Sequence, residues 1–191
     1  MNSNHCVIYK WNDCFYKVIL ENDFIYNNFQ IQSLTKNDFN SILSISDIPQ
    51  YMLDIAINDK YISSAKNLKN FVNRVFENEN KDCFNACFLY IISGKLVAFL
   101  NATINFEVAE IDYIYVVNEL RKKGVSHFLM NIFINCVNLA KNLKMSKISL
   151  EVGNTNIAAN LFYKKFGFQE VGIRKKYYKD HEDALIMEKS L

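Results

Sequence analysis

A short basic segment places three cations beside a glycine, a composition that suits the binding of an anion. The segment consists of Arg121, Lys122, Lys123, Gly124, Val125 and Ser126. An apolar, β-branched run precedes it, and a stretch with helical periodicity follows it. The first N–H groups of a helix lack partners within the helix and lie at the positive end of its dipole, so such a loop can bind a phosphate. A basic loop with a helix-starting glycine explains the same residues equally well.

Two further side chains have the chemistry for proton transfer. Glu151 lies at the end of a predicted strand, residues 147–152, and Tyr163 lies within the predicted helix that follows, residues 156–166. Open α/β sheets usually bind ligands where their strands end. At that place a carboxylate suits a general base and a phenol suits a general acid. Taken singly, Glu151 is also explained as a solvated strand end, and Tyr163 as a core aromatic residue.

Hydrophobic periodicity and turn residues predict the elements that position these groups. Strands followed by alternating strands and helices favour a mixed α/β layer fold. Thr35 is the expected N-cap of a helix that runs towards Ser46, and Ser93 with Gly94 is expected to form a hairpin turn. The predicted strands are residues 6–10, 15–20, 29–34, 87–92, 95–105, 110–117, 147–152, 168–176 and 184–188, and the other predicted helices are 59–78, 125–144 and 156–166, the last ended by Gly167.

Length and composition exclude several classes of protein. A chain of 191 residues, half of them hydrophobic, is long enough for one domain with a buried core. A net charge of +2 does not indicate a nucleic-acid-binding protein. The five scattered cysteines favour free thiols over a disulfide framework or a zinc site. No apolar run of about 18 residues is present, so we expect a cytoplasmic protein without a membrane partner.

The order of these features resembles the GNAT acetyltransferase superfamily. One motif is the basic loop, in which Ser126 stands where the family prefers Gly or Ala, and the other is the segment at 156–168, which matches Asn-x-x-Ala-x-x-Leu/Phe-Tyr-x-x-x-Gly-Phe. The tail at residues 174–187 is similar to the Tyr-Tyr … Glu-Asp-Ala-x-x-Met signature of N-terminal amino-acid acetyltransferases, especially the ribosomal-protein alanine acetyltransferase group. The resemblance predicts an N-terminal extension at 1–27 and a GNAT domain at 28–191.

This resemblance implies a fold and a cofactor. The fold would be a central, twisted, mostly antiparallel sheet flanked by helices, with two splayed strands forming a cleft for acetyl-CoA. Residues 121–126 would bind the pyrophosphate through backbone N–H groups. Val116 and Val117 would pair with the pantetheine arm, and Asn156 would contact the cofactor. No metal ion is implied.

The resemblance also implies catalytic and acceptor-binding roles. Glu151 matches the general base and Tyr163 the acid that protonates the departing thiolate, with Glu110 the next candidate for the base. Tyr177 and Tyr178 match the residues that line the acceptor slot. His181 lies in the same predicted loop, where it would either border that slot or be solvated.

The predicted activity is transfer of an acetyl group from acetyl-CoA to a primary amine, most specifically the N-terminal α-amine of a protein such as a ribosomal protein. An α-amine has a pKa of about 7.7–8.0 and lysine about 10.4, so lysine costs roughly 3–4 kcal/mol more to deprotonate at neutral pH. The alternatives are a small-molecule amine acceptor, such as a polyamine or an antibiotic, and a CoA-binding regulatory module without catalysis. The sequence does not indicate an oligomeric state.

Overall fold

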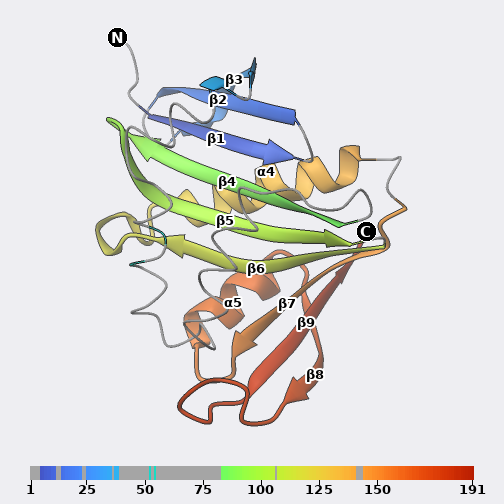
Figure 1. Cartoon of the computed structure of the whole chain (residues 1–191). Coiled ribbons are helices and arrows are strands. Elements are labelled where there is room, and N and C mark those ends of the chain that lie inside the picture. The colour runs from blue at the N-terminus through green and yellow to red at the C-terminus, as the bar shows by residue number, and fades with distance from the viewer. Residues whose placement is uncertain are drawn as a thin grey trace.

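The computed structural model describes residues 5–11, 14–22, 25–35, 37–38, 52, 54, 83–105, 107–140 and 144–191. Within these ranges, nine strands form one sheet in the order β3-β2-β1-β4-β5-β6-β7-β9-β8 (Figure 1). Only β6 and β7 pair in parallel, and the other seven pairs are antiparallel. The strands are β1 (His5–Trp11), β2 (Cys14–Asn22), β3 (Ile25–Leu34), β4 (Cys83–Ile92), β5 (Lys95–Asn105), β6 (Val108–Val116), β7 (Lys147–Gly153), β8 (Gln169–Arg174) and β9 (Ala184–Ser190).

Two α-helices accompany this sheet in the described part of the chain, α4 (Val125–Leu139) and α5 (Ile157–Lys165), together with the short 3-10 helix η1 (Asn118–Leu120). The mixed α/β fold with a mostly antiparallel sheet is therefore confirmed. The helix predicted at 59–78, and the predicted helix beyond residue 38, lie outside the described residues.

The first three strands form an antiparallel meander that joins the central sheet through β1. β1 lies beside β4, with Val7 opposite Tyr90, and β2 lies between β1 and β3. Two strands of the sheet thus come from residues 1–27, and the boundary predicted at 27/28 falls within β3. The assignment of this segment as an extension outside the GNAT domain stays a prediction.

Two local structures, a helix cap and a hairpin turn, are present as predicted. The hydroxyl of Thr35 accepts a hydrogen bond from the Asp38 N–H (3.1 Å), and the Thr35 N–H donates to the Asp38 carboxylate (3.2 Å), a reciprocal cap. Ser93 and Gly94 both have positive φ, 49° and 76°, which is the backbone that a two-residue hairpin turn between β4 and β5 requires.

The core lies between α4 and the sheet face formed by alternate residues of β4, β5 and β6. The predicted end of α4 at Lys144 was wrong, because Ala140 (φ −77°, ψ 55°) leaves the helical conformation. The physical reason is burial. Val137 is 3% exposed, whereas Asn138 and Leu139 after it are exposed, Leu139 by 78%, so packing no longer stabilises further helix. The buried residues of α4 are Val125, Phe128, Leu129, Met130, Ile132, Phe133 and Val137.

Candidate active site

A cleft opens where β6 and β7 part. These strands pair only from Val108 to Ile111 on β6 and from Lys147 to Leu150 on β7. Immediately beyond, Asp112 is an extra residue in β6, since Ala102 of β5 lies opposite Ile111 while Asn101 lies opposite Tyr113. A bulge of this kind bends its strand. β7 instead continues alongside β9, and β6 and β7 fan apart (Figure 1).

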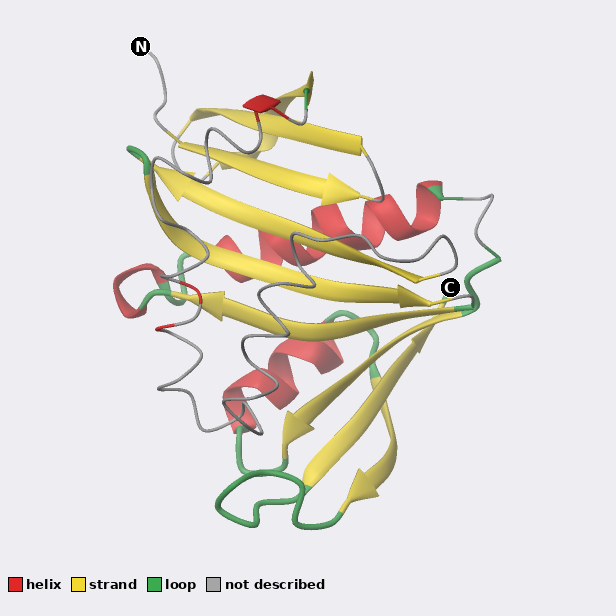
Figure 2. Cartoon of the chain, in the orientation of Figure 1, coloured by secondary structure: helices red, strands yellow, loops and turns green. Residues whose placement is uncertain are grey.

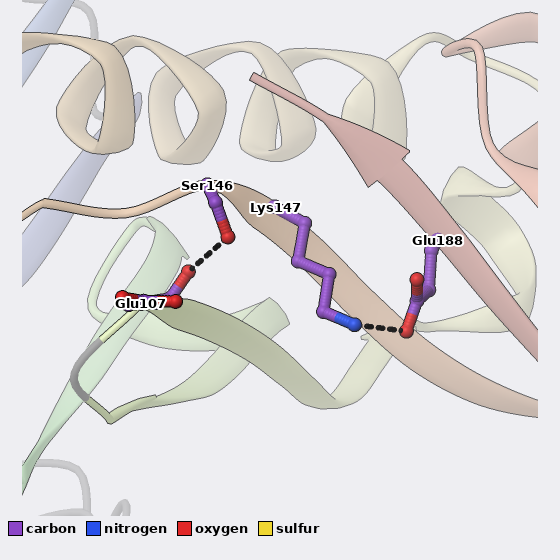
Figure 3. Close-up of polar contacts among 4 residues, drawn as sticks. All are labelled: Glu107, Ser146, Lys147 and Glu188. Atoms are coloured by element: carbon purple, nitrogen blue, oxygen red, sulfur yellow. Dashed lines mark hydrogen bonds and ion pairs between the residues drawn. The ribbon is translucent and has the colours of Figure 1, made fainter.

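The closed end of this cleft is fixed by contacts around Glu107 and Ser146. The Glu107 carbonyl accepts hydrogen bonds from the Ser146 N–H (2.8 Å) and hydroxyl (3.2 Å), and Lys147 forms an ion pair with Glu188 of β9 at 2.6 Å (Figure 3). The Leu191 N–H donates to the Ser146 carbonyl (3.0 Å). β6 is therefore held beside β7 and β9 at this end, and it parts from β7 at the other.

The open end encloses a cavity of about 980 Å³. Its walls come from β6, the loop before α4, the end of β7, and α5. Of the predicted site residues, the structure brings to this cavity Val116, Arg121, Lys122, Gly124, Ser126, Glu151, Asn156, Tyr163 and Tyr178. The described residues that line it do not include Val117, Lys123, Val125 or Tyr177.

The basic loop has the backbone geometry of an anion site. Gly124 is the N-cap of α4 and has φ 85° and ψ −5°, a conformation that glycine adopts readily. The first helical hydrogen bond runs from the Phe128 N–H to the Gly124 carbonyl (3.0 Å). The N–H groups of Val125, Ser126 and His127 therefore have no acceptor within the helix, and they lie at its positive end.

The cations of this loop differ in placement. All three are exposed, and Arg121 and Lys122 line the cavity while Lys123 does not. The Arg121 Nε donates to the Val116 carbonyl (3.0 Å), so part of its guanidinium supports the end of β6. Lys122 has φ 63°, which turns the chain sharply between the strand and the helix.

Along β6, every second residue directs its backbone N–H and carbonyl groups towards the cavity. The Val117 N–H donates to the Val97 carbonyl of β5 (3.0 Å), so it points away from the cavity. Because the direction of backbone groups alternates along an antiparallel strand, those of Val116 and Ile114 point the opposite way. Ile114 lines the cavity and was not indicated by the sequence. The pantetheine contact predicted for Val117 stays a prediction.

Two asparagines shape the start of α5. The Asn156 side chain accepts a hydrogen bond from the Ala159 N–H (3.2 Å) as the helix N-cap. The Asn160 side-chain amide donates to the carbonyls of Gly153 (3.4 Å) and Asn154 (3.3 Å). Asn160 therefore holds the turn between β7 and α5, which places Asn156 on the cavity wall.

Tyr163 is a buried phenol on this wall. It is 6% exposed, and its ring packs edge-on against Phe162 and Phe168, with centroids 5.3 and 5.8 Å away. Burial raises the pKa of Tyr163 above its ordinary value. The group is therefore protonated at neutral pH, as a proton donor must be.

Glu151 is held by Arg174 of the tail and influences Tyr177 beside it. Its Oε1 atom lies 2.7 Å from the Nε atom of Arg174, and its side chain is 15% exposed. Burial, followed by a hydrogen bond to Glu151 and the charge of that carboxylate, raises the pKa of Tyr177 to about 12. The Arg174 guanidinium also lies over the Tyr177 ring, 5.5 Å from its centroid. The sequence signals did not indicate Arg174, whose partners lie on another strand and in a loop.

The two tail tyrosines face different surroundings. Tyr178 is 5% exposed and lines the cavity, whereas Tyr177 is 37% exposed and packs beside it with a centroid separation of 5.2 Å. Burial raises the pKa of Tyr178, and the charges of Glu151, Tyr177 and Tyr163 add to that effect. His181 is exposed, with φ 62°, in the loop between β8 and β9.

The acidic residues of the tail signature fasten this loop to the turn before α5. The Glu182 carboxylate accepts hydrogen bonds from the Thr155 N–H (2.8 Å) and hydroxyl (2.6 Å). The Asn154 N–H donates to the Asp183 carbonyl (3.0 Å), and the Asp183 carboxylate binds Lys175 (2.7 Å). The two loops meet at the same end of the molecule (Figure 2).

The fold, the parted strands and the loop before α4 define an acetyltransferase-type site, and the family comparison agrees. The chain belongs to the GNAT acetyltransferase family, whose model matches residues 51–168. Enzymes of this family use acetyl-CoA. The cavity, the α4 N–H groups and the outward backbone of β6 fit such a ligand.

Two curated relatives and one solved structure are similar to the chain. A putative ribosomal protein bS18-alanine N-acetyltransferase of Bacillus subtilis is 40% identical over 49% of this chain and 61% of its own length. An N-alpha-acetyltransferase of Sulfolobus acidocaldarius is 26% identical over 84% of this chain and 91% of its own. The crystal structure of the ribosomal-protein-S18-alanine N-acetyltransferase from Escherichia coli has a TM-score of 0.57 and 24% identity, covering 84% of this chain and 92% of that one, and it shows the same fold.

Two kinds of structural feature are absent from the described part of the chain. No helix there combines the length and the apolar character needed to cross a membrane. Nor do three or more His, Cys, Asp or Glu side chains gather in that part of the chain in a way that would hold a metal ion.

Proposed function

We propose that the protein transfers the acetyl group of acetyl-CoA to the N-terminal α-amine of a protein, with a ribosomal protein as the first candidate acceptor. The observation that carries this proposal is that Glu151 and Tyr163 line the same cavity as Gly124 and Ser126 at the start of α4. The names of the relatives from Bacillus and Sulfolobus support an α-amine as acceptor.

The cofactor would lie along the loop and β6. The N–H groups of Val125, Ser126 and His127 would donate to the pyrophosphate, with Arg121 and Lys122 supplying positive charge. The outward backbone of Val116 and Ile114 would pair with the amides of the pantetheine arm. This arrangement directs the thioester towards Glu151 and Tyr163, and holding both reactants in one cleft supplies much of the rate.

The chemical step is direct. The amine nitrogen attacks the thioester carbonyl carbon, and Glu151 accepts the proton that the amine loses, directly or through a water molecule. The C–S bond then breaks, and the Tyr163 hydroxyl gives its proton to the departing thiolate. The products are an N-acetylated acceptor and CoA. The proton on Glu151 then returns to Tyr163 through solvent, which restores both residues.

Labelled acetyl-CoA offered to a library of peptides with free N-termini, beside spermidine and other small amines, tests this proposal. We expect peptides to be acetylated with the higher kcat/KM. Preferential labelling of a small amine would assign the protein to the alternative acceptor class. Binding of acetyl-CoA without transfer to any amine would identify a regulatory module.

A further inference from the structure

Arg174 makes two contacts at once. Its Nε atom lies 2.7 Å from the Glu151 Oε1 atom, and its guanidinium covers the Tyr177 ring at 5.5 Å. Burial and, after it, the nearby Glu151 carboxylate raise the pKa of Tyr177. The guanidinium therefore connects the carboxylate to the phenol ring, and it limits the movement of both.

Other ion pairs of the same length lack this connection. Lys164 of α5 and Glu170 of β8 lie 2.7 Å apart with half-exposed side chains. Exposed pairs of that kind add little to stability, because solvent screens them and both side chains lose freedom. The Arg174 pair differs since its carboxylate is 15% exposed and lines the cavity. Its geometry matters for the site more than for the fold.

We propose that Arg174 is a positioning residue for acetyl transfer, which holds the Glu151 carboxylate through Oε1 and the Tyr177 ring through its planar face. The proposal rests on the proposed function, in which Glu151 accepts the proton of the amine. A guanidinium suits this task better than an ammonium, because it is planar, hydrogen-bonds in a fixed direction and stacks on an aromatic ring. Loss of it frees the carboxylate to rotate away from the amine.

Three variants separate positioning from a structural role. Arg174→Gln removes the charge and the fork, Arg174→Lys keeps the charge, and Glu170→Gln removes the matched ion pair from the same strand. We expect Arg174→Gln to lower kcat by about tenfold, since a small displacement of a reacting group is costly, with an unchanged KM for acetyl-CoA. Arg174→Lys should recover only part of that loss, and Glu170→Gln should leave kcat unchanged.

A second measurement does not depend on turnover. In protein labelled with ¹³C-tyrosine, the Tyr177 ring signal is assigned by its loss in Tyr177→Phe. We expect that signal to shift in Arg174→Gln and to stay in place in Glu170→Gln. Guanidinium ion, at concentrations far below those that unfold the protein, should also restore part of the kcat of Arg174→Ala, which sodium ion should not do.

The outcomes distinguish two failures. If the wild type acetylates no peptide, the proposed function fails, and with it the role of Arg174 in that reaction. If the wild type is active and Arg174→Gln retains full kcat or leaves the Tyr177 signal unmoved, the proposed function stands and the positioning role is overturned. A kcat loss of the same size in Glu170→Gln would also overturn it, because any change in β8 would then suffice.

Discussion

The two sides of the cavity are built from different groups. On the α4 side, formed by residues 114–127, the cavity meets backbone N–H and carbonyl groups that neither the helix nor β5 uses. On the tail side, it meets the side chains of Glu151 and Tyr178, and other tail residues hold Glu151 and the turn before α5 in place through side-chain contacts. A site made of backbone requires one particular conformation, whereas a site made of side chains requires particular functional groups. Substitutions should therefore act through backbone strain on the first side and through lost protons or hydrogen bonds on the second.

The largest effect is expected at the phenol of the α5 wall. Tyr163→Phe keeps the ring packed against Phe162 and Phe168 and removes only the proton donor. We expect kcat to fall about 10²-fold, with little change in the affinity for CoA. Tyr9→Phe is the control, since Tyr9 is equally buried but lies on β1. Wild-type turnover in Tyr163→Phe would mean that water protonates the thiolate.

On the α4 side, Gly124→Val should weaken the binding of CoA by at least about tenfold, because valine is strained at φ 85° and its side chain would enter the place proposed for the phosphate. Titration calorimetry measures this affinity. Gly94→Val is the control for backbone strain, because it introduces similar strain at φ 76° in the β4–β5 turn, where nothing lies within 4 Å of the added Cβ. Equal affinity in Gly124→Val and the wild type would remove the basis for a phosphate site at this loop.

The two tail tyrosines should respond differently. Tyr178 lines the cavity, so Tyr178→Phe is expected to raise the KM for a peptide by about 2- to 10-fold, the worth of one hydrogen bond, without altering the KM for acetyl-CoA. Tyr177 instead packs beneath Arg174, which pairs with Glu151, so Tyr177→Phe should lower kcat more than it changes either KM. Steady-state kinetics with both substrates varied measures these effects. An identical response of the two variants would contradict this division.

The smallest effect concerns stability in acid. A hydrogen bond from Lys175, followed by the Lys176 N–H, holds the pKa of Asp183 below its usual range. The ionised form therefore stabilises the fold. That contribution is complete above the unfolded-state pKa of about 3.9, and it is lost as the pH falls through the lower folded-state value. Urea unfolding should show that the stability deficit of Asp183→Asn shrinks below about pH 4. A deficit independent of pH would contradict the ion pair.

The parts that the sequence predicts are those with local causes. The cap at Thr35, the turn at Ser93 and Gly94, and the left-handed Gly167 that follows α5 each depend on neighbours within a few residues.

Other features depend on residues far apart in the chain. The place of β1 beside β4, the bulge at Asp112 and the contact of Arg174 with Glu151 arise from packing between strands. Periodicity also extended α4 beyond Leu139, because an apolar pattern does not reveal where the sheet beneath a helix ends. The direction in which Val117 points needed the register of β5 and β6.

One comparison tests the central claim most directly. Two peptides of the same sequence, each with an internal lysine, are offered with acetyl-CoA, one with a free N-terminus and one with that terminus blocked, and the acetylated atom is located by tandem mass spectrometry. We expect acetylation of the α-amine of the free peptide alone, and its loss in Glu151→Gln. Efficient acetylation of lysine in the blocked peptide, or full activity of Glu151→Gln, would contradict the account.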